Sequence, residues 1–143
     1  MDFLLLVEDL SKAENILSKF AYQRTFKSEN VAQYVSDLAP YGQIDVLIAF
    51  REISRGMLER RVVRSSDETR PLYTLLPSDL IGFKLQAAMN DPSREEREIA
   101  DMKGLIEQVE DIELDWELLR EYFSLFDRLE LLEQIKNGNG ETE

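Results

Sequence analysis

The chain of 143 residues contains neither cysteine nor histidine. Disulfide bonds, thiolate or imidazole zinc sites, Ser-His-Asp triads and histidine acid–base catalysis are therefore excluded. Long hydrophobic runs are also missing, and the N-terminus lacks the basic region and cleavage site of a secretory signal. Carboxylates, lysines and hydroxyl groups are the side chains left for chemistry, and the sequence predicts a soluble cytoplasmic protein.

Basic residues are scarce: 17 lysines and arginines stand against 29 aspartates and glutamates, which gives a formal net charge of −12. Broad, non-specific nucleic-acid binding draws its affinity from clustered basic side chains, so this balance argues against it. A local basic patch remains at Arg60, Arg61 and Arg64, where a nucleic acid would be able to dock.

A hydrophobic fraction of 43% in 143 residues is enough for one domain with a core. We therefore predict a single domain over residues 1–136 and a disordered tail over residues 137–143. Residues 1–75 are expected to be rich in strands, and residues 77–136 to be helical. The predicted fold class is α/β (α+β), a mixed sheet with packed helices and a helical C-terminal portion.

The strand-rich part begins with an uninterrupted apolar run, which predicts a strand over Asp2–Val7 that is covered on both faces. A second apolar run, after a turn at Pro40 and Gly42, predicts a strand over Ile44–Phe50. The other expected elements are a helix over Leu10–Phe20, a short helix over Glu52–Glu59, and strands at Thr25–Phe26, Val31–Val35, Val62–Val63 and Leu72–Leu75.

Helices are predicted from residue 77 onward. The first begins at Pro77-Ser78 and is stopped by Asn90-Asp91-Pro92. Ser93 and Glu96 have the spacing of a capping box at the start of the second. The apolar stripes of the later helices contain Ile99, Met102, Ile106 and Val109, then Leu118, Leu119, Tyr122 and Phe123, and finally Leu129, Leu132 and Ile135.

Two aspartates stand at the start of the apolar strands, Asp2 and Asp45. Burying an unpaired carboxylate costs several kcal/mol, so acidic residues here need an explanation. If the two strands are neighbours, both side chains converge on one Mg²⁺ ion, a hard cation that prefers oxygen ligands. In the alternative interpretation each aspartate caps the end of its strand in solvent.

Lys84 lies on the apolar stripe of its helix, four residues after Leu80 and three after Ile81. Its ammonium group either meets the phosphates of a nucleotide or extends past the stripe to water. Asp101 lies beside the apolar face of the next helix, where a partner lysine would explain it equally well.

Four short segments carry a family resemblance. Residues 76–87 read Leu-Pro-Ser-Asp-Leu-Ile-Gly-Phe-Lys-Leu-Gln-Ala, and residues 97–102 read Arg-Glu-Ile-Ala-Asp-Met. Residues 2–5 and 44–47 are the two strand starts that contain Asp2 and Asp45. In this order and spacing the segments resemble bacterial nucleotidyltransferase-like proteins, a group that includes the nucleotidyltransferase toxins of abortive-infection systems.

The resemblance implies a polymerase-beta-type fold, in which three carboxylates hold divalent metal, here Mg²⁺, and a nucleoside triphosphate donates a nucleotidyl group. It makes Asp2 the second acid of an Asp-x-Asp pair, Asp45 the third carboxylate, and Lys84 and Asp101 nucleotide-binding residues. Carboxylates and metal ions suffice for this displacement, so the absence of histidine is no obstacle. The resemblance also implies a partner antitoxin.

The sequence departs from the family pattern at its beginning. The first acid of the pair would lie two positions before Asp2, and no Gly-Gly or Gly-Ser pair is present for the turn whose amides bind the phosphates. Nucleotidyl transfer by this chain is therefore expected to be impaired. Three alternatives follow: a native start upstream, a non-catalytic relative that binds a nucleotide or a protein, and an unrelated α/β interaction module. Apolar surface left uncovered on Phe3–Val7 further predicts a homodimer.

Overall fold

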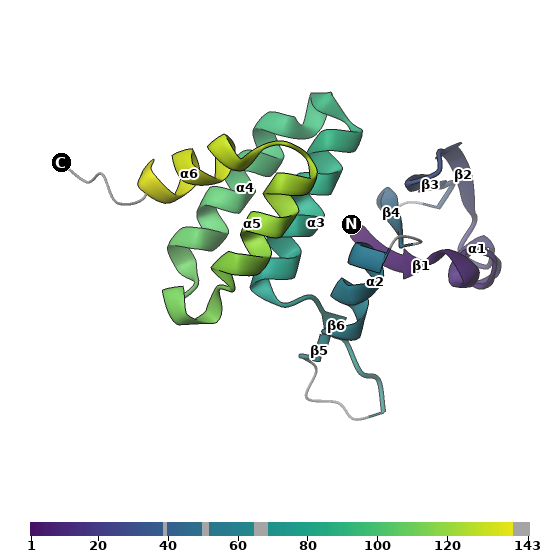
Figure 1. The fold of residues 1–143 in the computed structure, drawn as a ribbon. Helices are drawn as coiled ribbons and strands as arrows, with labels where there is room; N and C mark the ends of the chain where they lie inside the picture. Colours follow the sequence, from purple (N-terminus) through teal and green to yellow (C-terminus); the bar gives the residue numbers. More distant parts are fainter. Residues whose placement is uncertain (39, 50–51, 65–68, 139–143) are drawn as a thin grey trace. The chain divides into compact units, whose positions relative to one another are not determined.

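In the computed structural model, which describes residues 1–38, 40–49, 52–64 and 69–138, the chain is a mixed α/β protein, as the sequence predicts. Its contacts divide it into two units, residues 1–59 and residues 60–143 (Figure 1). The first unit holds a four-stranded sheet, and the second holds a two-stranded sheet followed by helices. The border between the two units lies earlier in the chain than residues 75–77, where the sequence predicts the change from the strand-rich part to the helical part. The reason is that the two strands of the smaller sheet belong to the same unit as the helices.

The first unit is built around a sheet with the strand order β1, β4, β3, β2. β1 (Asp2–Leu6) runs parallel to β4 (Ile44–Ala49). β3 (Val31–Ser36) runs antiparallel to both β4 and β2 (Tyr22–Lys27). All four strands lie where the sequence predicts strands, and the predicted last residue of the fourth, Phe50, lies outside the described residues.

β1 is an edge strand, and the prediction that it is covered on both faces is wrong. Within the described residues only β4 pairs with it, and its own residues are exposed or half-buried, with Phe3 41% exposed. β4 has the inner position, and its last four residues, Val46 to Ala49, are all buried. An apolar run shows that a strand is hydrophobic. It does not show which strands pair with it, because pairing joins segments that are distant in the sequence.

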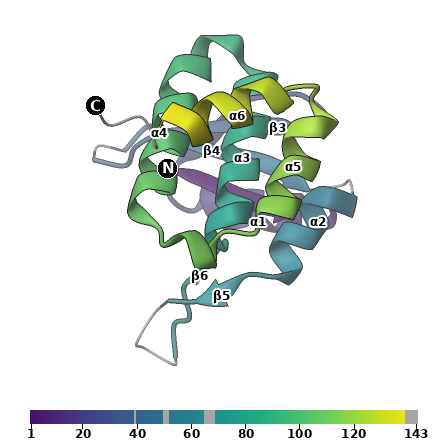
Figure 2. The same cartoon turned by 60° about the vertical axis from the view of Figure 1, so that its left-hand side comes forward.

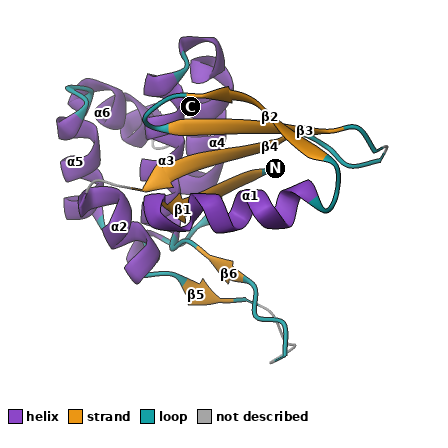
Figure 3. Cartoon of the chain, turned by 90° about the vertical axis from the view of Figure 1, so that its right-hand side faces the viewer, coloured by secondary structure: helices purple, strands orange, loops and turns teal. Residues whose placement is uncertain are grey.

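Two helices pack on the sheet of the first unit. A single 3-10 turn at Val7–Asp9 leads into α1 (Leu10–Ser18), which lies across one face of the sheet (Figure 3). α2 (Glu52–Glu59), which has the predicted bounds, contacts β1 and β4 and buries Met57. The buried core under α1 contains Leu10, Ala32, Tyr34, Val46 and Ile48.

The second unit begins with a ribbon of two antiparallel strands, β5 (Val62–Val63) and β6 (Tyr73–Thr74). The helices that follow lie where the apolar stripes predict them, and Figure 2 shows the first of them between the next two. No helix in the described parts of the chain is both long and apolar enough to cross a bilayer. The helices are α3 (Pro77–Asn90), α4 (Glu95–Gln108), α5 (Trp116–Leu125) and α6 (Leu129–Gly138).

Two predicted details of the helical unit need correction. Ser93 does not cap α4, because it lies in a 3-10 turn and donates its N–H and hydroxyl to Asp91 at 3.1 and 2.6 Å. The local hydrogen bond to Asp91 outcompetes the predicted capping box with Glu96. At the C-terminus α6 continues through Gly138, so residues 137 and 138 are helical, while residues 139–143 lie outside the described residues.

Candidate functional site

The two aspartates predicted at the strand starts lie side by side. Asp2 of β1 and Asp45 of β4 are register partners in the parallel pair, and register partners place their side chains on the same face of a sheet. Gln33 of β3 is paired with Asp45 from the other side and continues the row. Asp2 is exposed, whereas Asp45 is half-buried. The condition for their convergence on one cation, neighbouring strands, is therefore met.

Hydrogen bonds at the strand starts orient Asp45. The Asp45 N–H donates to the Met1 carbonyl oxygen at 2.9 Å, and the Met1 ammonium group donates to the Gln43 carbonyl oxygen at 3.0 Å. The Gln43 side-chain amide donates to Asp45 Oδ1 at 2.8 Å. The Asp45 carboxylate is thus oriented both by its strand and by a neighbouring amide.

The donor set of the acidic pair suits Mg²⁺ as a partner of phosphate groups. Proteins commonly bind Mg²⁺ through one or two carboxylates, and water and substrate phosphates supply the remaining oxygens. Among the residues that the structure describes, no group of three or more side chains of the metal-binding types is placed to hold an ion. A cation at Asp2 and Asp45 therefore needs phosphate or water oxygens to complete its coordination.

Lys84 of α3 is held by two carboxylates of α4. Its Nζ lies 3.0 Å from Asp101 Oδ2 and 3.4 Å from Glu98 Oε2. Glu98 is 2% exposed and also accepts a hydrogen bond from Arg94 at 2.7 Å. Lys84 is thus the partner lysine of Asp101, and its side chain, 18% exposed, does not extend freely to water. This cluster ties α3 to α4.

The predicted site residues fall into two pairs. Asp2 and Asp45 belong to the unit of residues 1–59, and Lys84 and Asp101 belong to the unit of residues 60–143. The structure brings the members of each pair together. Their roles as metal and nucleotide ligands stay predictions.

The sequence did not predict a buried charge network at the start of α3. The Asp79 side chain is 0% exposed and accepts hydrogen bonds from Arg60 Nε at 2.9 Å and Nη2 at 2.7 Å. The Tyr122 hydroxyl donates to the same carboxylate at 2.5 Å. Arg60 therefore neutralises an internal carboxylate. Its charge serves the fold, and Arg61 and Arg64 are what is left of the predicted basic patch.

One sequence signal pointed to this network. Asp79 precedes Gly82 and Phe83 by three and four residues, so helical periodicity places it on the face of α3 that both of them share. All three residues are buried. A carboxylate on such a face requires a charged partner, but the identity of that partner depends on the tertiary structure.

Two buried tyrosines make the stability of the protein sensitive to alkaline pH. Burial, and then a hydrogen bond to a carboxylate, raise the pKa of Tyr34 beside Glu14 and of Tyr122 beside Asp79. In the unfolded chain both phenols ionise near pH 10. The native state therefore holds more protons above about pH 10, and the free energy of unfolding is expected to fall as the pH rises further.

An alkaline titration checks this prediction through tyrosinate absorbance and circular dichroism. Two of the five tyrosines are expected to ionise together with the loss of secondary structure. Tyr34→Phe should remove one of the two from the unfolding step. Ionisation of all five before any loss of secondary structure would contradict the prediction.

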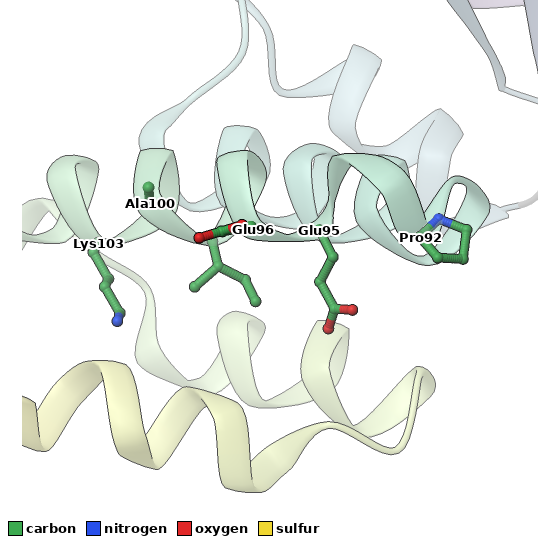
Figure 4. Close-up of a pocket in the computed structure, with 6 residues that line it drawn as sticks. Pro92, Glu95, Glu96, Ala100 and Lys103 are labelled. Atoms are coloured by element: carbon green, nitrogen blue, oxygen red, sulfur yellow. The ribbon is translucent and has the colours of Figure 1, made fainter.

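An open hollow of about 530 Å³ lies along α4 (Figure 4). None of the four predicted site residues lines it, and its Glu95 forms an ion pair with Arg128 at 2.7 Å. The hollow's lining residues are Pro92, Glu95, Glu96, Ile99, Ala100 and Lys103.

Comparisons with known proteins leave the family open. No protein-family model matches the chain, and no curated protein matches it. The resemblance to nucleotidyltransferase-like proteins stays a prediction, and the function has to be argued from the geometry of the two pairs.

Proposed function

We propose that this protein binds a Mg²⁺–nucleoside triphosphate at Asp2 and Asp45, as a nucleotidyltransferase-like protein. The observation that carries the proposal is the register of β1 and β4, which sets these two carboxylates beside each other on one face of the sheet. The segments over residues 76–87 and 97–102, which are similar to those of nucleotidyltransferase-like proteins, support it as well.

Each residue of the acidic pair has a defined task in this proposal. Asp2 and Asp45 supply carboxylate oxygens to Mg²⁺, and Gln43 keeps Asp45 oriented by its hydrogen bond to Oδ1. The cation, when bound, neutralises phosphate charge and favours in-line displacement at phosphorus, which is the chemistry of nucleotidyl transfer. The chain needs no histidine for these steps.

The resemblance makes Lys84 and Asp101 nucleotide-binding residues, but they lie in the other unit and are not part of the site proposed at Asp2 and Asp45. The Lys84 ammonium group is shared between Asp101 and Glu98. Its ion pairs join α3 to α4 within the unit of residues 60–143.

Calorimetry with Mg²⁺-ATP and Mg²⁺-GTP tests the proposal. Asp45→Asn is expected to weaken binding at least about tenfold, because the amide lacks the charge that the carboxylate offers to Mg²⁺. The matched control is Asp37→Asn, which removes the same charge from an exposed position of the same unit and is expected to bind like the wild type.

Equal affinities for Asp45→Asn and Asp37→Asn would contradict the proposed site. Absent heats for all variants with both nucleotides would favour a second candidate function, a non-catalytic protein-interaction module. That candidate is supported by Phe3 and Val7, which are 41% and 45% exposed on and just after the edge strand β1. Apolar residues at a sheet edge are the kind of surface through which two copies of a chain form a homodimer.

A further inference from the structure

The β5–β6 ribbon exposes apolar side chains. In Figures 1, 2 and 3 the β5–β6 ribbon extends away from the helices of its own unit. Val63, Leu72 and Tyr73 are 54%, 60% and 50% exposed. A two-stranded ribbon is only marginally stable in water by itself, and exposed apolar side chains gathered on one element are typical of a binding surface.

The ribbon is also a basic part of an acidic protein. From Arg61 to Thr74 the sequence has three arginines against two acidic residues, whereas the whole chain has a net charge of −12. Arg64 and Arg70 are exposed. The Arg61 guanidinium carbon lies 4.9 Å from the centre of the Tyr73 ring, so a cation and an aromatic face are presented together.

The foot of the ribbon is fixed to the helices. Arg60 directly precedes the ribbon arginines and is held by two hydrogen bonds to the buried Asp79, with Tyr122 beside it. A partner therefore meets a surface whose base is already ordered, and preorganisation lowers the entropic cost of binding.

The backbone of the ribbon offers a further means of recognition. Within the described residues β5 and β6 form a sheet of two strands, so each strand pairs on one side and has an open edge on the other. An extended peptide can add to such an edge through main-chain hydrogen bonds, and alternate side chains then meet the side chains of the ribbon.

We infer that the β5–β6 ribbon binds an acidic, extended peptide segment of a partner protein. The charge of the ribbon selects acidic side chains, and Val63 and Leu72 select apolar residues between them. Tyrosine and arginine, both present here, are enriched in protein interfaces. A nucleic acid fits less well, because phosphates gain little from exposed valine and leucine and the net charge of −12 repels a long polyanion.

The experiment uses a labelled peptide of alternating glutamate and valine, and fluorescence anisotropy reports its binding to the full chain. The double variant Arg64→Glu/Arg70→Glu is expected to weaken binding at least about tenfold. The matched control Arg97→Glu/Arg120→Glu reverses two exposed arginines on the helices and is expected to bind like the wild type. Added salt is expected to weaken binding, and circular dichroism checks that both variants fold.

Four results would overturn the inference. In the first, the variant Arg64→Glu/Arg70→Glu binds the peptide as tightly as the wild type does. In the second, a peptide with lysine in place of glutamate binds as tightly as the glutamate peptide. A third is no peptide binding while an oligothymidine strand binds with the same dependence on Arg64 and Arg70. The fourth is association of the chain with itself, seen by sedimentation, that the ribbon variant abolishes. None of these results depends on nucleotide binding at Asp2 and Asp45.

Discussion

Replacing Arg60 with methionine is expected to lower the free energy of unfolding by about 2–4 kcal/mol, because it leaves the buried Asp79 carboxylate without its cation. Asp79 is 0% exposed and receives two hydrogen bonds from Arg60. The range lies slightly below that for a fully buried ion pair because the Arg60 side chain is 40% exposed and water screens part of the interaction. Urea unfolding followed by circular dichroism measures the change.

A matched variant and a double variant separate the causes. Arg64→Met removes an exposed arginine four residues away and is expected to change the free energy of unfolding by less than about 0.5 kcal/mol. Arg60→Met combined with Asp79→Leu removes both charges and is expected to be more stable than Arg60→Met alone, since no buried charge is then left unpaired. A single variant Arg60→Met as stable as Arg64→Met would contradict this account of the network.

Gly82→Ala is expected to lower the free energy of unfolding by about 1–3 kcal/mol through overpacking. A Cβ atom at Gly82 would lie 2.6 Å from Cδ2 of Tyr122. The Tyr122 ring is 1% exposed and its hydroxyl is held by Asp79, so the ring has little freedom to move away. Thermal and urea unfolding of the variant measure the loss.

Gly104→Ala is the control, because it makes the same change in a helix without the close contact. Gly104 lies inside α4, and among the described residues no atom other than those of its chain neighbours and of the nearby helix backbone lies within 4 Å of the Cβ position. Helix propensity alone then acts, and the variant is expected to be more stable than the wild type by about 0.5–1 kcal/mol. The two alanine variants are thus expected to differ in sign, and a shared sign would show that the contact with Tyr122 does not decide the effect.

The positions of most elements could be predicted because their signals are local. The helix over Glu52–Glu59 and the strand over Val62–Val63 have the expected bounds. Pro77 begins α3, and Asp91-Pro92 follows its end, as the restricted backbone of proline requires. Periodicity, capping and proline act over a few neighbouring residues, so the sequence contains the whole signal.

The candidate site could be predicted only in part. The starts of the two apolar strands directed attention to Asp2 and Asp45, but their meeting depends on the parallel pairing of β1 with β4. Periodicity singled out Lys84, whereas its carboxylate partners lie 14 and 17 residues further along the chain. Partners at such separations are selected by how helices and strands pack, and no local pattern records that choice.

The sequence by itself determined the chemistry that this protein lacks, the order of its strands and helices along the chain, and the candidates Asp2, Asp45 and Lys84. The tertiary structure alone decided that β1 is an edge strand and that Arg60 neutralises the buried Asp79 rather than a ligand. The physical reason is the range of the interactions. Backbone preferences and side-chain periodicity act within one turn or one strand, whereas strand order and the pairing of buried charges arise from packing between distant segments.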